Sequence, residues 1–175
     1  MDYKKKLEEF NSTSKYKAEL DFLLMLTNDC NGSFMDYGCG IGTAMNYIKR
    51  KRNVSIAGYD IVPMLKYEYL RYVRNDSAVN LVFFMHSIAH IQNIKEVLTN
   101  ILDTNHVVVI TPNADWLAKV SKEGYIPDST VYKHYTQAEL VALFESCGYV
   151  VNLYGSFGNN VEGFNERIFL KASKL

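Results

Sequence analysis

Seven residues, Asp36 to Gly42, have the spacing of a glycine-rich turn that binds nucleotides. Their sequence, Asp-Tyr-Gly-Cys-Gly-Ile-Gly, follows a short apolar stretch and precedes a segment with helical periodicity. Glycines at such a turn permit positive φ angles and let a ligand approach the backbone. About eighteen residues later, Asp60 ends a second apolar stretch, where a carboxylate can accept hydrogen bonds from ribose hydroxyls. The turn and the carboxylate together indicate a nucleoside-binding site.

Asp36 favours one class of nucleoside ligand over another. A carboxylate at the mouth of the turn repels the pyrophosphate of a dinucleotide, but it attracts a cation such as the ammonium group of a methionine moiety. S-Adenosylmethionine therefore fits this turn better than NAD. The alternative is a tight turn that holds no ligand, in which Asp60 only caps a helix.

The elements that must position these residues alternate between short apolar stretches and longer helical segments. This alternation predicts parallel strands joined by crossover helices, and hence an α/β fold with a doubly wound, mostly parallel sheet between two helical layers. Strands are predicted at 33–37, 54–59, 80–85 and 106–110, the last ended by Pro112, and helices at 43–51 and 94–102.

The last third of the chain predicts a helix followed by two strands. Thr136 and Glu139 form a capping box at the start of the helix, and Gly148 lies where a glycine commonly follows a helix end. Strands are predicted at 149–154 and 167–172. Because no helix separates them, they should pair antiparallel.

The N-terminal part predicts a helix that packs on another part of the protein, preceded by a separate segment. Residues 15–27 form an amphipathic helix with Tyr16 on its apolar face, and the first ten residues are predicted to be a mobile arm. A length of 175 residues allows one substantial core, so we expect a single domain. Within it, we assign 1–30 to an N-terminal helical lid segment and 31–175 to a domain that binds S-adenosylmethionine.

From about Gly32 to Leu175 the chain resembles the class I S-adenosylmethionine-dependent methyltransferases of the small-molecule type. The resemblance rests on the glycine turn, on the segment 80–91 (NLVFFMHSIAHI), on Thr-Pro-Asn at 111–113 and on the antiparallel last strand, which in the family forms the sheet edge. It implies S-adenosylmethionine as cofactor and S-adenosylhomocysteine as product. The residues that it places at the cofactor are Asp36, Tyr37, Gly38, Cys39, Gly40, Gly42, Asp60, Ile61, Met85, His86 and Ser87.

The chain departs from the family between Asp60 and Leu81. These residues are about 20 apart, a span in which the family fits a helix, a third strand and a connecting segment. Either 69–73 is a short third strand, which makes Asp76 the contact of the adenine amino group, or 62–73 is helical and the third strand is missing. A shortened edge of this kind is compatible with a homodimer.

Two histidines are the candidate catalytic residues. His86 and His90 follow a strand end, and a neutral imidazole can take the proton of an acceptor hydroxyl or ammonium group. The alternative is a packing role for either histidine. Candidates for binding the acceptor are Tyr16, Asn113, Asp115 and Trp116, although Trp116 and Asp115 have packing and capping as alternatives. The insert 123–127 is expected to shape the substrate cavity.

We therefore expect a cytoplasmic transferase that methylates an oxygen or nitrogen atom of a small molecule or natural-product intermediate, without a metal. The alternative is a non-catalytic protein that binds S-adenosylmethionine as a partner or regulator. Lys plus Arg and Asp plus Glu number 19 each, so no overall field attracts nucleic acid. The longest apolar runs fall far short of the roughly 20 residues that span a bilayer, so no membrane partner is expected.

Overall fold

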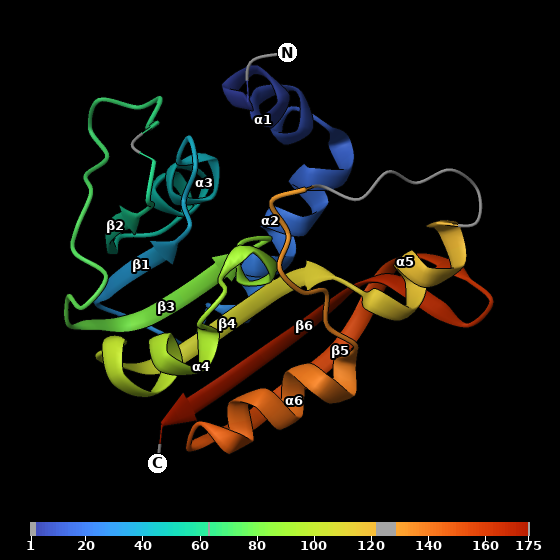
Figure 1. Cartoon of the computed structure of the whole chain (residues 1–175). Helices are drawn as coiled ribbons and strands as arrows, with labels where there is room; N and C mark the ends of the chain where they lie inside the picture. The colour runs from blue at the N-terminus through green and yellow to red at the C-terminus, as the bar shows by residue number, and fades with distance from the viewer. Residues whose placement is uncertain (1–2, 63, 122–128, 175) are drawn as a thin grey trace.

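The computed structural model describes residues 3–62, 64–121 and 129–174 of the chain. Its helices and strands alternate over the first two thirds and then give way to a helix and a strand pair (Figure 1). In chain order they are α1 (Tyr3–Asn11), α2 (Ser14–Leu26), β1 (Ser33–Tyr37), α3 (Thr43–Lys51), β2 (Ser55–Tyr59), β3 (Val79–Met85), the 3-10 helix η1 (Ile88–His90), α4 (Ile94–Glu96), the π-helix η2 (Val97–Ile101), β4 (Thr104–Pro112), α5 (Ala114–Val120), α6 (Gln137–Ser146), β5 (Tyr149–Val161) and β6 (Phe164–Lys174).

Six strands form one sheet in the order β2-β1-β3-β4-β6-β5. The first four run parallel, and β6 pairs antiparallel with both β4 and β5, so that β6 points against β3 and β4 in Figure 1. The predicted mostly parallel sheet with an antiparallel C-terminal strand is therefore confirmed. The position of the last strand was predicted wrongly: β6 lies inside the sheet, and β5 forms its edge.

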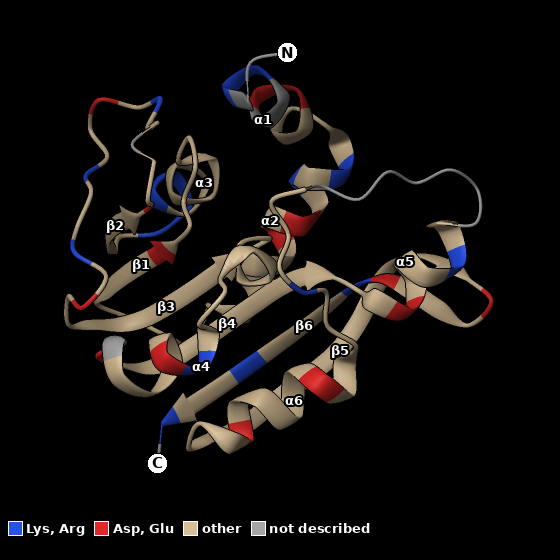
Figure 2. Ribbon diagram, in the orientation of Figure 1, with Lys and Arg blue, Asp and Glu red and all other residues tan. Residues whose placement is uncertain are grey.

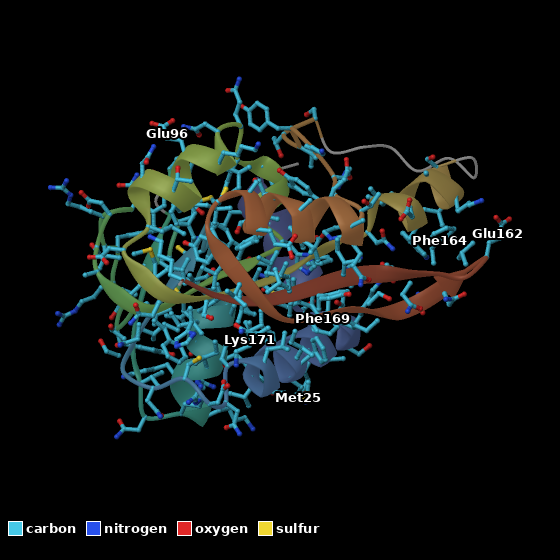
Figure 3. All side chains as sticks on the ribbon, turned by 90° about the horizontal axis from the view of Figure 1, so that it is seen from below. Met25, Glu96, Glu162, Phe164, Phe169 and Lys171 are labelled. Atoms are coloured by element: carbon cyan, nitrogen blue, oxygen red, sulfur yellow. The ribbon has the colours of Figure 1, made fainter. Side chains whose placement is uncertain are left out.

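Apolar residues cover both faces of the sheet and make two cores. Residues of α2 and α3 pack on one face against Phe34, Phe83 and Ile110, whereas residues of α4, η2 and α6 pack on the other against Val82 and Val109. Figure 3 shows these two helical layers on opposite sides of the sheet. The three-layer architecture follows from strands that are apolar on both faces.

The region of the missing third strand is neither a strand nor a helix in its described residues. One parallel bridge joins Gly58 to Tyr72, with hydrogen bonds of 2.9 Å from Gly58 N to Arg71 O and from Val73 N to Gly58 O. Of the two alternatives, the short strand is nearer to the structure, but it is reduced to this single bridge. The Tyr72 hydroxyl accepts hydrogen bonds from the backbone N–H groups of Met64 and Leu65, which holds the segment beside β2.

The N-terminal residues form two helices in place of the single helix and arm that the sequence predicts. Thr13 caps α2 by accepting a hydrogen bond from Tyr16 N. The end of α1 is fixed by a 2.8 Å hydrogen bond from Asn11 to Thr43, and Glu8 pairs with Lys66 at 3.1 Å. The predicted mobile arm is therefore wrong for the described part of it, because α1 contacts both α3 and the segment after β2.

Most predicted boundaries agree with the structure, and four elements differ. The strand predicted at 167–172 is β6, which is longer at both ends. The predicted helix over 94–102 begins as α4 and continues as the π-helix η2, while β4 includes Pro112 and β5 extends to Val161. The capping box of Thr136 and Glu139 is confirmed, and Gly148 follows α6 with φ 81°. In the described part of the chain, no helix has the length and apolarity needed to cross a bilayer.

Candidate functional site

The glycine turn folds back on the end of β2. Gly38, Gly40 and Gly42 have φ angles of 82°, 51° and 82°. The N–H groups of Gly38 and Cys39 both donate to the carbonyl oxygen of Tyr59, at 2.7 and 3.1 Å. Because non-glycine residues rarely adopt positive φ, the three glycines let the chain turn sharply between β1 and α3.

Close packing adds a second reason for glycine at two of these positions. A Cβ atom on Gly38 would lie 2.4 Å from Cβ of Ser87, and one on Gly42 would lie 2.7 Å from Cδ2 of Leu65. Ser87 also donates a hydrogen bond to the carbonyl oxygen of Tyr37. The turn is therefore held between the end of β3 on one side and the segment after β2 on the other.

The two acidic residues predicted at the site have different environments. Asp60 accepts hydrogen bonds from Gly40 N at 2.7 Å and from Val62 N at 2.9 Å, one on each carboxylate oxygen. Asp36 is 2% exposed, and its Oδ1 atom has no hydrogen-bond partner in the described part of the chain. Burial, and then the neighbouring charge of Asp60, raise the pKa of Asp36 well above its usual range.

An unpaired buried carboxyl group is complementary to a cation, because an ammonium ligand would both donate hydrogen bonds and supply the missing positive charge. Asp36 therefore fits the ammonium group of S-adenosylmethionine. A small cleft of about 200 Å³ opens beside the turn, between α1 and the segment after β2. It is lined by Glu8, Asn11, Ser12, Ile41, Thr43, Lys66 and Tyr67.

The other residues predicted to bind the cofactor differ in burial and packing. The ring of Tyr37 packs on the rings of Tyr59 and Phe84, with centroids 4.7 and 5.2 Å away, and burial raises its pKa to about 12. Tyr37 thus belongs to the core. Met85 and Cys39 are likewise buried in apolar clusters, whereas Ile61 is 85% exposed.

His86 lies directly after β3, beside Ser87 and the turn. Its Nε2 atom is 2.5 Å from Oε2 of Glu19, a residue of α2. The rings of Phe10 and Tyr16 lie 5.7 and 6.1 Å from the His86 ring, centroid to centroid. Burial, and then the charge of Asp36, raise the pKa of Tyr16. The N-terminal helices thus bring aromatic rings and one carboxylate to the site.

The second predicted histidine is engaged elsewhere. His90 ends the 3-10 helix η1, and its Nδ1 atom is 2.9 Å from Oγ1 of Thr130 and 3.2 Å from the Thr130 carbonyl oxygen. This pairing corresponds to the packing alternative for His90. His86 is therefore the better placed of the two candidate bases.

The three candidates after β4 are arranged around the start of α5. Asn113 caps α5, accepting from Asp115 N at 3.1 Å, and donates to the Asn165 carbonyl oxygen at 2.9 Å. The indole Nε1 of Trp116 is buried and has no hydrogen-bond partner in the described residues. Asn113 thus has a capping role, whereas no role follows from the contacts of Trp116.

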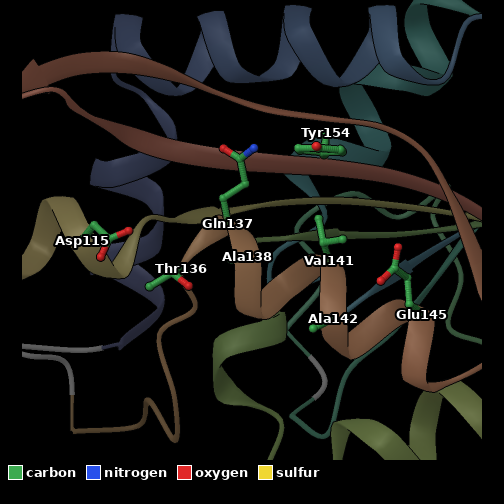
Figure 4. A pocket seen from close by; sticks show the side chains of 8 residues that line it. All are labelled: Asp115, Thr136, Gln137, Ala138, Val141, Ala142, Glu145 and Tyr154. Carbon is green, nitrogen blue, oxygen red and sulfur yellow. The ribbon is translucent and has the colours of Figure 1, made fainter.

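Asp115 lines a separate groove of about 730 Å³ between α5, α6 and β5. Figure 4 shows the Tyr154 ring above Val141 and the Glu145 carboxylate at the far end from Asp115. None of its lining residues is among the predicted cofactor contacts, so this groove is distinct from the turn. The insert 123–127, expected to shape the substrate cavity, lies outside the described residues.

The sequence interpretation missed the buried charges that surround His86. Glu19 and Arg167 are 2% and 6% exposed, and Glu166 is 4% exposed. One signal was present: Glu19 falls at helical spacing among Tyr16, Leu20 and Leu23, on the apolar face of α2. A carboxylate inside such a face requires buried partners.

Figure 2 shows basic and acidic residues interspersed along the ribbon. Across residues 3–62, 64–121 and 129–174, no three His, Cys, Asp or Glu side chains are grouped to hold a metal ion.

The geometry agrees with the comparisons to known proteins. A family model described as a methyltransferase domain matches residues 6–153. No curated protein matches the chain. Similar solved structures include a SAM-dependent methyltransferase from Archaeoglobus fulgidus, with 17% identity and a TM-score of 0.72, covering 99% of this chain and 100% of that one.

Two other similar structures are of enzymes named for different methyl acceptors. The magnesium protoporphyrin IX methyltransferase of Synechocystis, solved with bound S-adenosylhomocysteine, has 14% identity and a TM-score of 0.65, covering 91% of this chain and 84% of that one. The small RNA methyltransferase HEN1 has 16% identity and a TM-score of 0.69. Although 91% of this chain is covered, that match spans only 25% of the HEN1 chain. At these identities the likeness concerns the fold.

Proposed function

Because this chain belongs to the methyltransferase domain family and is an S-adenosylmethionine-dependent methyltransferase, we propose that it methylates an oxygen or nitrogen atom of a small molecule. The observation that carries the proposal is Asp36, a buried carboxyl group with an unpaired oxygen beside a turn of three glycines. An ammonium ligand would satisfy that oxygen, and the positive φ angles of the three glycines turn the chain back beside it.

The chain's own residues divide the work of binding the cofactor. Asp36 would hold the ammonium group, the backbone of Gly38 to Gly42 would bound the methionine part, and Asp60 would accept from the ribose hydroxyls. The cofactor supplies an activated methyl group on a sulfonium centre. Transfer of that group needs mainly correct positioning of the acceptor, since a thioether is a good leaving group.

Removal of the proton from the methyl acceptor is the remaining chemical task, and we assign this task to His86. Its ring lies at the end of β3, next to Ser87, which packs on Gly38. Desolvation by burial lowers the pKa of His86, so the imidazole is neutral at pH 7 and able to accept a proton. His86 therefore acts as general base in this proposal.

A small acceptor is supported by charge. Nucleic-acid recognition relies on a surplus of Lys and Arg near phosphates, whereas this chain has 19 basic and 19 acidic residues. The three cysteines, Cys30, Cys39 and Cys147, are buried and unpaired. Reduced thiols are typical of proteins of the cytoplasm, which is where we propose that the enzyme acts.

Calorimetry and turnover together test the proposal. S-Adenosylmethionine titrated into the protein should bind with one site per chain, and incubation with a panel of small hydroxyl and amine compounds should form S-adenosylhomocysteine. A panel of tRNA and small RNA serves as the comparison. Methylation of RNA alone would overturn the small-molecule assignment, and absence of cofactor binding would overturn the role of the turn.

A further inference from the structure

Glu19 lies at the centre of a buried chain of charged side chains that joins α2 to β6 and to the end of β3. Its Oε2 atom is 2.5 Å from His86 Nε2, and its Oε1 atom accepts from Arg167 Nε at 2.7 Å. Arg167 Nη1 donates to Glu166 Oε1 at 2.9 Å, and Lys15 bonds to the same oxygen. Both carboxylate oxygens of Glu19 are thus occupied by partners from other elements.

His86 holds an uncommon backbone conformation at the point where it meets Glu19. Its φ angle is 62°, and its N–H group donates to Ile110 O at 2.8 Å. A non-glycine residue in this region is strained and persists where surrounding contacts hold it. The bond to Glu19 and the backbone bond to β4 are the contacts that fix the ring here.

The charge states of the pair follow from their surroundings. Burial of Glu19 would by itself raise its pKa, but hydrogen bonds and charges from His86 and Arg167 outweigh burial, so that the pKa is lowered. For His86, burial lowers the pKa and outweighs the opposing attraction of Glu19; the charge of Arg167 lowers it further, and that of Glu166 raises it. Arg167 is always charged and keeps Glu19 ionised at pH 7, while burial keeps His86 neutral.

The ionised carboxylate determines which ring nitrogen carries the proton. A carboxylate can only accept a hydrogen bond, so Nε2 of His86 must be the protonated nitrogen. Nδ1 is then the basic nitrogen, and it has no hydrogen bond to the described residues. The side chain of His86 retains 17% of its exposure, beside the rings of Phe10 and Tyr16.

We infer that Glu19, backed by Arg167, is a positioning residue that fixes His86 with a free Nδ1, and that the acceptor is an uncharged hydroxyl compound, such as a phenol. The inference rests on the proposed function. As the acceptor oxygen bonds to the methyl group, its proton moves to Nδ1, and the electron pair of the broken carbon–sulfur bond stays on sulfur as S-adenosylhomocysteine. The resulting imidazolium is stabilised by Glu19.

The balance of charges in the cluster points to an uncharged acceptor. Lys15 and Arg167 offset Glu19 and Glu166, so the cluster presents no net charge to a ligand. Each of these four charges already lies beside an opposite charge of the same cluster. The aromatic rings of Phe10 and Tyr16 are suited to contact a planar apolar body.

Nitrogen NMR of the histidine rings tests the positioning role without an acceptor. The full chain is labelled with ¹⁵N, saturated with S-adenosylhomocysteine and titrated with acid, and His86 is assigned from its loss in His86→Asn. We expect the Nε2–H form at pH 7 and a pKa below the ordinary 6.5. A protonated ring at pH 7, or the Nδ1–H form, would overturn the inference.

Glu19→Gln tests whether the carboxylate positions the ring. Asp21→Asn is the control, because Asp21 is an exposed acid of the same helix and accepts a hydrogen bond from Tyr47. In Glu19→Gln the tautomer should become mixed and the pKa of His86 should fall further, since the attraction of the carboxylate is lost. Asp21→Asn should leave both unchanged. An unaltered tautomer in Glu19→Gln would show that Glu19 does not position the ring.

Methyl transfer to 4-methylcatechol and 4-methylphenol, which are uncharged at pH 7, compared with phenethylamine, tests the acceptor class. Glu19→Gln should lower kcat, by at most the roughly 10²- to 10⁴-fold that a general base contributes in full, because His86 is kept but loses its fixed tautomer and orientation. The KM for S-adenosylmethionine should stay unchanged. In the unmodified protein, kcat should rise with pH through the pKa of His86 found by NMR. A panel in which both phenols are inert overturns the hydroxyl assignment. Failure of S-adenosylhomocysteine to bind the unmodified protein counts instead against the proposed function.

Discussion

The carboxylate of Asp60 accepts a hydrogen bond of 2.7 Å from the backbone N–H of Gly40, which lies 20 residues earlier in the chain. This bond ties the end of β2 to the middle of the glycine turn. The same carboxylate is the one expected to bind ribose, so the contact that shapes the turn also places the acidic group beside it. In the proposed cofactor site, turn geometry and sugar recognition would thus depend on the same side chain.

Replacing Asp60 tests that coupling. Asp60→Ala removes the carboxylate that accepts a hydrogen bond from Gly40 N and that is expected to accept hydrogen bonds from the ribose. The affinity for S-adenosylmethionine should therefore fall by about 1–3 kcal/mol, the scale of a hydrogen bond to a charged group. Calorimetry gives the value. Asp76→Ala is the control, because Asp76 is exposed and pairs with Arg74. Equal losses in both variants would mean that Asp76 also contacts the cofactor, as the short-strand alternative implies.

Asp36→Asn should have opposite effects on stability and on binding. With its pKa raised, folded Asp36 keeps a proton that the unfolded chain has lost, so stability falls as pH rises above the ordinary value of 3.8. The variant escapes this cost. Its Tm without ligand should exceed that of the original protein at pH 8, and the difference should shrink towards pH 4.

The same substitution should weaken cofactor binding, because the amide offers no charge to an ammonium group. We expect a loss of about 10- to 100-fold in affinity for S-adenosylmethionine at pH 8, corresponding to a charged hydrogen bond of roughly 1.5–3 kcal/mol. Thermal unfolding and calorimetry on the two proteins supply both numbers. Equal affinity in the variant would contradict the role of Asp36.

Two glycines with nearly identical φ angles allow the cost of backbone strain to be measured apart from the cost of a steric clash. Gly38 and Gly148 have φ of 82° and 81°, but a Cβ on Gly38 would meet Ser87 at 2.4 Å, whereas one on Gly148 would meet nothing within 4 Å. Gly148→Ala should cost about 1–2 kcal/mol of unfolding free energy and leave cofactor affinity unchanged. Gly38→Ala should cost more and reduce the affinity, as measured by urea unfolding and calorimetry.

The segment after β2 depends on one hydroxyl group. Tyr72 accepts from the N–H groups of Met64 and Leu65 at 2.5 and 2.9 Å. Tyr72→Phe should therefore speed hydrogen exchange at these two amides, because they lose their acceptor. Tyr69→Phe removes instead a hydroxyl that bonds to Asn46, and it should leave the two amides unchanged. Equal exchange rates in all three proteins would show that other contacts hold the segment.

Regular periodicity explains which elements the sequence predicts well. Strand 33–37 and helix 43–51 match β1 and α3 because apolar residues, glycines and polar residues mark their ends directly. The antiparallel pairing of the last two strands follows from the missing helix between them. The insertion of β6 next to β4 has no local signal, since strand order depends on contacts between segments far apart in sequence.

The site was predictable in its backbone and less so in its side chains. The turn and Asp60 come together as predicted because the ends of adjacent parallel strands share one edge of the sheet. The Tyr37 side chain, by contrast, packs in the core, since alternate residues of a strand face opposite sides. The partners of Glu19 lie on β3 and β6, so only the folded chain reveals them.

A crystal structure with S-adenosylhomocysteine tests the central claim most directly. The account predicts its amino group within hydrogen-bonding distance of Asp36 Oδ1 and its ribose hydroxyls on Asp60, with the glycine turn beneath the methionine part. A ligand bound in the groove between α6 and β5, or an Asp36 Oδ1 that stays unpaired at saturating ligand, would contradict it.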